Sequence, residues 1–79
     1  MIERIKEMGL EVDGNEELID VRGDNAKLME LKRILDDEGY QNDTATMKFI
    51  FGTPIPKDNE VNRILINYVG GETGYMLVA

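Results

Sequence analysis

The sequence contains no cysteine, histidine, serine or tryptophan. Without cysteine there are no disulfide bonds, and without cysteine and histidine the usual zinc sites are excluded. The missing residues also include the commonest acid–base group of enzymes and their two commonest nucleophiles. The four threonines that remain have no evident activating base beside them. We therefore expect a protein that is not an enzyme and that carries no cofactor.

Long apolar runs are also missing. The longest are Tyr75–Ala79 and Ile64–Ile66, and both are far too short to span a membrane. Charged and apolar residues are interleaved from the first residue onward, which is not the pattern of a signal peptide. Together with the lack of cysteine, this predicts a cytoplasmic protein without a membrane segment.

Basic residues are few, and the acidic excess is uneven. The net charge is −7, and residues 1–43 hold 13 acidic against 6 basic residues, whereas residues 44–79 hold 3 of each. A field of this sign repels phosphate groups, so we expect no direct binding of nucleic acid. It attracts a basic protein surface and speeds the encounter with it. The alternative is that the acidity serves only solubility.

The length of the chain fits one small domain that covers residues 1–79. Apolar residues make up 42% of the sequence, which is enough for a single core. A core of this size leaves a net stability of only about 3–5 kcal/mol. The fold therefore depends on close packing, or on contacts with another chain.

Two segments show the spacing of amphipathic helices. A short N-terminal helix is predicted before Gly9, which can adopt the left-handed conformation that ends a helix. Its apolar positions are Ile2, Ile5 and Met8. A longer helix is predicted over residues 24–38, with Asp24 as its N-cap and Gly39 after its last turn. Its apolar face consists of Leu28, Leu31, Ile34 and Leu35.

Two segments show strand patterns. The pair Asp13-Gly14 lies between apolar segments and predicts a hairpin over residues 10–22, because a tight turn needs positive φ at its centre. Apolar and polar residues alternate from Thr44 to Phe51, which predicts a half-buried strand. These two patterns indicate an antiparallel sheet.

Residues 59–69 fit both periods, that of a helix and that of a strand. We favour a strand, followed by a turn over Gly70–Gly74 with Gly74 in the left-handed conformation and by a return strand at Tyr75–Ala79. So apolar a strand must be covered inside the sheet or by another subunit.

The predicted fold class is α+β. It is a small two-layer sandwich in which an antiparallel sheet, made of the hairpin 10–22 and a meander over 44–79, carries the helix 24–38 on one face. The short N-terminal helix packs beside it. The alternative, with 59–69 helical, is a βαβαβ fold with a small parallel sheet.

Oxygen ligands would be needed for any metal site. Asp13–Glu17 resembles the start of a calcium loop, but Leu18 and Asp24 stand where such a loop needs glycine and a bidentate glutamate. A second acidic cluster, Asp36–Glu38, ends the long helix, where each carboxylate faces the negative end of the helix dipole at a cost of about 0.3–1 kcal/mol. We expect no metal site. The second cluster indicates either a functional need for negative charge or a solvated helix end.

The functional hypothesis is a protein-binding module, an inhibitor or adaptor that docks on a basic surface of a nucleic-acid-handling protein. This style of action suits phage or mobile-element proteins that mimic nucleic acid. The predicted partner-binding residues are Glu11, Asp13, Glu16, Glu17, Asp36, Asp37, Glu38 and Asp43. The alternative is a homo-oligomeric structural or accessory subunit that associates through the Tyr75–Ala79 strand or the N-terminal helix.

The first prediction is that folding requires no divalent metal. Removal of metal with EDTA should change the midpoint of thermal unfolding by less than a few degrees, because the sequence has no histidine or cysteine and its calcium-loop match is poor. Circular dichroism melts with and without the chelator measure this. A larger drop in the midpoint, restored by added calcium, would contradict it.

Overall fold

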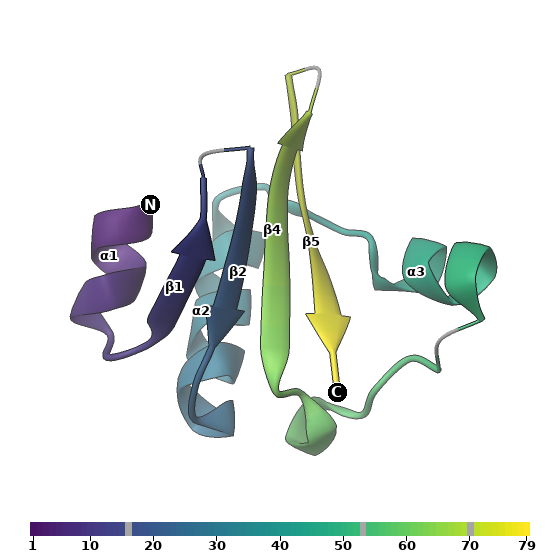
Figure 1. The fold of residues 1–79 in the computed structure, drawn as a ribbon, viewed down its shortest axis with the longest axis horizontal. Helices are drawn as coiled ribbons and strands as arrows, with labels where there is room; N and C mark the ends of the chain where they lie inside the picture. The colour runs from purple at the N-terminus through teal and green to yellow at the C-terminus, as the bar shows by residue number, and fades with distance from the viewer. Residues whose placement is uncertain (16, 53, 70) are drawn as a thin grey trace.

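The structure is a computed structural model that describes residues 1–15, 17–52, 54–69 and 71–79. Figure 1 shows its elements in chain order. They are α1 (Ile2–Glu7), β1 (Glu11–Gly14), β2 (Leu18–Arg22), α2 (Asn25–Asp37), β3 (Gln41–Asn42), α3 (Thr44–Phe51), a short 3-10 helix η1 (Asp58–Glu60), β4 (Arg63–Val69) and β5 (Glu72–Val78).

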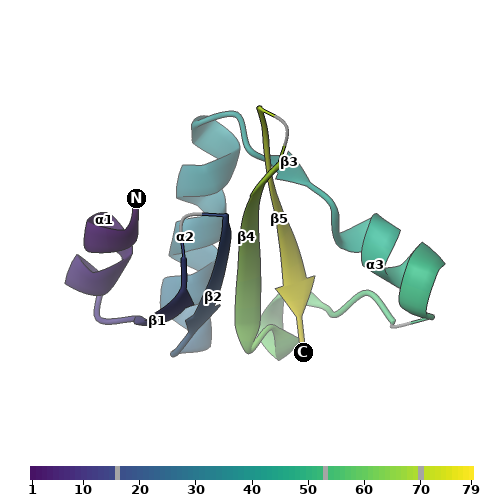
Figure 2. The same ribbon diagram turned by 45° about the horizontal axis from the view of Figure 1, so that its top comes forward.

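The strands form one five-stranded sheet in the order β1-β2-β4-β5-β3. Neighbouring strands are antiparallel except at one edge, where β3 runs parallel to β5. Figure 2 shows β3 beside β5, in the segment that links α2 to α3. The predicted α+β class is confirmed, with a sheet that is mixed and mostly antiparallel.

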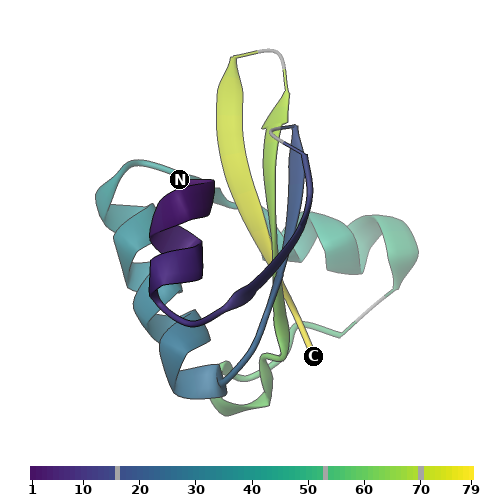
Figure 3. The same cartoon turned by 60° about the vertical axis from the view of Figure 1, so that its left-hand side comes forward.

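The helices lie on two sides of the sheet. Figure 3 shows α1 and α2 on one side and α3 on the other. Alternate residues of β2, β4 and β5 point toward α1 and α2, as the pleat of a strand requires. Together with α1 and α2 they form the core, whose buried members include Ile5, Val21, Leu28, Leu31, Leu35, Ile64, Tyr75 and Leu77. We call the opposite side of the sheet the open face.

The β4–β5 hairpin confirms the strand interpretation of the ambiguous segment. Its register pairs Ile64 with Leu77 and Ile66 with Tyr75, so that all four side chains face the core. The position of the turn differs from the prediction. Gly71 adopts the left-handed conformation, with φ of 83°, whereas Gly74 lies inside β5. The predicted turn residue 70 lies outside the described residues.

The β1–β2 hairpin is also confirmed, but its turn is longer than a two-residue Asp-Gly turn. Gly14 has a φ of 98° and still belongs to β1, where it pairs with Ile19. The reversal follows at Asn15, whose side-chain oxygen accepts hydrogen bonds from the N–H groups of Glu17 and Leu18 at 2.8 and 3.2 Å. Such bonds from asparagine imitate a backbone turn and place the hairpin register.

The prediction of a strand from Thr44 to Phe51 is wrong, because this segment is α3. The hydroxyl oxygen of Thr44 accepts the N–H of Leu77 at 3.1 Å, so Thr44 occupies the outer edge of β5 where β3 ends. The chain beyond it leaves the edge of β5, which ends at Val78, and a helix satisfies its backbone groups internally. Gly52, with φ of 69°, ends the helix. Phe49 is then 91% exposed instead of half-buried.

The long helix agrees with the prediction except at one core position. The structure has α2 at Asn25–Asp37, with Asp24 at the N-cap position and Gly39 in the left-handed conformation after its end. Leu28, Leu31 and Leu35 are buried, but Ile34 is only half-buried and lies outside the core cluster.

Substitution of these residues should separate the core from its margin. Leu31→Ala should lower the free energy of unfolding by about 2–5 kcal/mol, because it removes a fully buried side chain. Ile34→Ala should lower it by only about 1 kcal/mol, because that side chain is already partly in water. Urea titration followed by circular dichroism measures both values. Equal losses in the two variants would mean that the helix is rotated relative to the sheet.

Candidate functional site

One end of the molecule gathers chain segments that are far apart in the sequence. The start of α1, the β1–β2 turn, the end of α2 and the β4–β5 turn all lie at the upper end in Figure 1. The antiparallel strands cause this, since hairpins on neighbouring strands return at the same edge. We call this region the acidic end. It carries Glu3, Glu17, Asp37, Glu38 and Glu72.

A pocket of about 530 Å³ opens at the acidic end. This volume falls within the roughly 300–1,000 Å³ of typical ligand sites. Its walls come from the start of α1, the link between α2 and β3, the start of β2 and the end of β4. We call it the tyrosine pocket. It is lined by Met1, Ile2, Glu3, Ile19, Tyr40, Ile66, Asn67 and Tyr68.

The tyrosine pocket is built on the rigid part of the fold. Ile19 and Ile66 pair across β2 and β4 and are buried, so they form an aliphatic floor that belongs to the core. Tyr68 follows on the same face of β4 and is 52% exposed, and its N–H donates to the carbonyl oxygen of Glu17 at 3.0 Å. Tyr40 is half-buried against the core. The fold therefore holds the ring of Tyr40 and the backbone of Tyr68 in place before any ligand arrives.

Glu3, which lines the pocket, and Glu17, whose backbone contacts Tyr68, have no basic partner in the part of the chain that the structure describes. Glu3 belongs to the lining, and both Glu3 and Glu17 are exposed. The ion pairs among the described residues involve neither of them. Their charge is thus directed at solvent beside an apolar pocket.

The predicted cluster at the end of α2 is different, because each of its acids has a base of the same chain. Lys32 lies 3.0 Å from Asp36, and Arg33 lies 3.5 Å from Asp37. Glu38 pairs with Arg4 and so links α2 to α1. Exposed pairs of this kind contribute up to about 1 kcal/mol each, which offsets the unfavourable helix dipole. These three carboxylates have a structural reason to be where they are.

Asp36 also receives a hydrogen bond from the core. The hydroxyl of Tyr75, whose ring is fully buried, donates to the Asp36 carboxylate at 2.5 Å. This bond, with a smaller contribution from Lys32, holds the pKa of Asp36 below its usual value, although partial burial acts in the opposite direction. Burial, followed by the nearby carboxylate, raises the pKa of the Tyr75 phenol above its usual value.

Asp43 serves the sheet edge. Its N–H donates to the carbonyl oxygen of Tyr75 at 2.8 Å, and its side chain is half-buried. The carboxylate lies over Gly74, so close that a Cβ atom there would be 2.2 Å from an oxygen of Asp43. Gly74 is thus required by contact with Asp43 and not by a turn.

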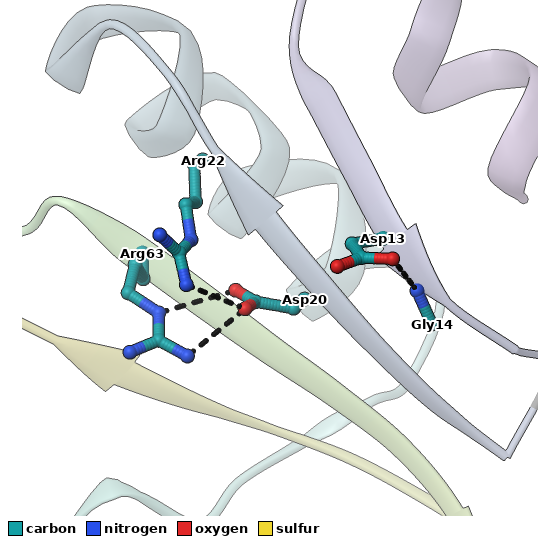
Figure 4. A network of polar contacts seen from close by, with 5 residues as sticks. All are labelled: Asp13, Gly14, Asp20, Arg22 and Arg63. Atoms are coloured by element: carbon teal, nitrogen blue, oxygen red, sulfur yellow. Dashed lines mark hydrogen bonds and ion pairs between the residues drawn. The ribbon is translucent and has the colours of Figure 1, made fainter.

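Glu11 and Asp13 lie on the open face. They border a shallow groove of about 480 Å³ with Val12, Asp20 and Arg22. Asp20 bridges two guanidinium groups: Arg63 donates to it at 2.9 Å and Arg22 at 3.1 Å, as Figure 4 shows. The hydrogen bond from Arg63 is the main reason that the pKa of Asp20 is lowered. The two arginines offset the acids here.

The structure therefore divides the predicted hairpin acids between two surfaces. Glu17 stands beside the tyrosine pocket, whereas Glu11 and Asp13 belong to the open face. Glu16 lies outside the described residues. Of the eight predicted residues, those at the acidic end are Glu17, Asp37 and Glu38.

The residues proposed for self-association contribute to the chain's own core. Ile5 is buried, and Ile2 and Met8 pack against the core. β5 lies between β4 and β3, with Tyr75 and Leu77 buried. The most exposed apolar side chains are instead on α3, where Phe49 is 91% and Ile50 62% exposed.

Sequence reasoning missed the lining of the tyrosine pocket. Glu3, Tyr40 and Tyr68 are more than 25 positions apart from one another, and no spacing rule relates them. The only available signal was that both tyrosines stand next to the predicted end of an apolar segment. An amphipathic ring at such a position commonly keeps one edge in water.

No helix in the described ranges is long and apolar enough to cross a membrane. The acidic side chains of these residues form no group of three that would hold a metal ion. Compared with models of known families, with curated proteins and with solved structures, the chain shows no significant match. The functional argument therefore rests on the site itself.

Tyr75→Phe should make stability less dependent on pH at both extremes. Because the folded pKa of Asp36 is depressed, its contribution is complete above about pH 4 and is lost as pH falls through the folded value. The raised pKa of Tyr75 contributes stability below about pH 10 that is lost as pH rises further. At pH 7 the variant should lose about 1 kcal/mol, a modest value because Asp36 is 43% exposed.

Urea titrations from pH 2 to pH 11 measure this, with Tyr68→Phe as the control because Tyr68 is half exposed. The difference between wild type and Tyr75→Phe should shrink at both ends of the range. A constant difference at all pH values would show that the Tyr75–Asp36 hydrogen bond contributes nothing to pH dependence. The pKa of Asp20 is also lowered, and Asp20 is present in both proteins, so its contribution to the loss of stability in acid is the same in both.

Proposed function

We propose that this chain is a protein-binding module and that a basic surface of its partner docks on the acidic end, with the tyrosine pocket at the centre of the contact. One observation carries the proposal. An apolar, partly aromatic pocket lies beside Glu3 and Glu17, carboxylates without an ion-pair partner among the described residues. Asp20, Asp36, Asp37 and Glu38, by contrast, have bases of the same chain beside them. Other carboxylates without an ion pair in the described ranges, such as Glu30, lie away from the pocket.

This combination matches the anatomy of protein interfaces. Binding energy concentrates in a few central residues, often tyrosines, that sit in desolvated pockets. Charged residues around the rim act mainly on the rate of association and on the choice of partner. The net charge of −7 gives the whole molecule a field that draws a basic partner from a distance.

The role that follows is occupation of a surface, as an inhibitor or adaptor does. A partner that handles nucleic acid presents the kind of basic surface that an acidic protein covers. The chain acts in this proposal without chemistry of its own, in keeping with the absence of histidine, cysteine and serine.

Affinity capture with matched charge variants tests the proposal. The immobilised chain is exposed to a lysate of its source cells at low and high salt, and bound proteins are identified by mass spectrometry. The double variant Glu3→Gln, Glu17→Gln should lose a basic protein that wild type captures at low salt. The control is Glu11→Gln, Glu30→Gln, which removes the same number of charges from the open face and from the exposed side of α2.

The control should retain the captured protein, because its substitutions lie away from the acidic end. Both variants lose two negative charges, so the long-range field is reduced equally and cannot cause a difference between them. Circular dichroism verifies that both are folded. Equal capture by the two variants would refute the acidic end as the docking site. Capture that is unaffected by salt, or of acidic proteins only, would refute the basic partner.

A further inference from the structure

The lining of the tyrosine pocket has a chemical character that is more specific than negative charge. Its floor is aliphatic, formed by Ile2, Ile19 and Ile66. Two phenol rings stand around this floor, and Glu3 supplies a carboxylate. The lining residues include no lysine or arginine. A ligand thus meets an apolar surface first and hydrogen-bond acceptors and π faces at the edge.

Three classes of ligand can be compared with this lining. An anion would face Glu3 and a field of net charge −7, and the described lining residues offer it no lysine or arginine side chain. A wholly apolar ligand would bury the Glu3 carboxylate without a hydrogen-bond partner, which costs free energy. A cation on an aliphatic stem suits every part, because its stem covers the floor and its charge meets the carboxylate and the rings.

We propose that the tyrosine pocket takes one arginine side chain of a basic protein partner. The inference rests on the proposed function and names the group that the pocket recognises. The methylene stem lies on Ile19 and Ile66, and the guanidinium lies at the rim between the tyrosine rings. It donates hydrogen bonds to the Glu3 carboxylate.

Arginine fits better than lysine for two physical reasons. Its planar guanidinium stacks on aromatic rings and sheds water more readily than an ammonium group. Its five N–H donors are spread over a fork, so that it donates two parallel hydrogen bonds to a single carboxylate. The pocket volume of about 530 Å³ also leaves room for the backbone that carries the side chain.

Blocked amino acids test this on the whole chain without knowledge of the partner. N-acetyl-arginine-N-methylamide is titrated into the isotopically labelled protein, and amide shifts are followed by NMR. Saturable shifts should appear at Ile19, Ile66 and Tyr68, residues of the lining. The lysine compound and the citrulline compound, which has nearly the shape of arginine without its charge, should bind about threefold to tenfold more weakly.

Two protein variants and two controls complete the test. Tyr68→Leu and Glu3→Gln should each weaken binding of the arginine compound about threefold to tenfold. Phe49→Leu also replaces an exposed aromatic residue, and Glu30→Gln also removes an exposed charge, but both lie away from the pocket and should leave binding unchanged. Circular dichroism verifies the fold of each variant.

Several outcomes would overturn the inference. One is equal binding of the arginine, lysine and citrulline compounds, and another is the absence of saturable shifts at the lining. Unchanged binding in Tyr68→Leu would do so as well. If one of these outcomes is observed while capture of a basic protein still requires Glu3 and Glu17, the proposed function stands and only the arginine assignment falls. If the arginine compound binds but no basic partner is captured, the pocket's preference for arginine stands and the proposed function falls.

Discussion

β5 needs a hydrogen-bonding neighbour along both of its edges, and the rest of the fold is arranged to supply them. β4 covers one edge for seven residue pairs. The other edge is covered in pieces, by β3, by the N–H of Asp43 and by the hydroxyl of Thr44. With both edges paired, the apolar residues of β5 become core, and Tyr75 reaches through that core to Asp36 at the end of α2. One strand thus ties the sheet to its covering helix.

The same constraint explains two surface features. Because Thr44 completes the edge of β5, the chain after it leaves the sheet and forms α3, whose apolar residues Phe49 and Ile50 stay exposed. Asp36 accepts hydrogen bonds from Tyr75 and Lys32, so the acidic cluster in the last turn of α2 contributes to the stability of the fold. Negative charge against a helix dipole is tolerated where nearby bases and a buried hydroxyl offset it. The acidic residues at the C-terminal end of α2 are therefore explained by contacts within the fold.

Two groups of carboxylates in this chain differ in their surroundings. Asp20, Asp36, Asp37 and Glu38 hold elements together through bases of the same chain. Glu3 and Glu17 stand beside the tyrosine pocket, and none of the ion pairs in the described ranges includes them. In the proposed function, the net charge accounts only for attraction of a basic partner at a distance, whereas the tyrosine pocket determines the shape of the contact. Recognition of one arginine would join the two, since that side chain is both apolar and positive.

The local pattern of the sequence was enough for α1, α2, both hairpins and the α+β class, because apolar period and glycine position are properties of a few neighbouring residues. It failed at Thr44–Phe51, where alternation suits a strand but the chain turns away from the edge of β5 once Thr44 has bonded Leu77. It also assigned Gly74 to a turn, although contact with Asp43 requires that glycine. The tyrosine pocket lay beyond its reach, since Glu3, Tyr40 and Tyr68 meet only when the sheet and both helices have formed. Charge and periodicity were set by the sequence alone; which charges are paired, and which surround a pocket, was decided by the tertiary structure, because pairing depends on distances between residues far apart in the chain.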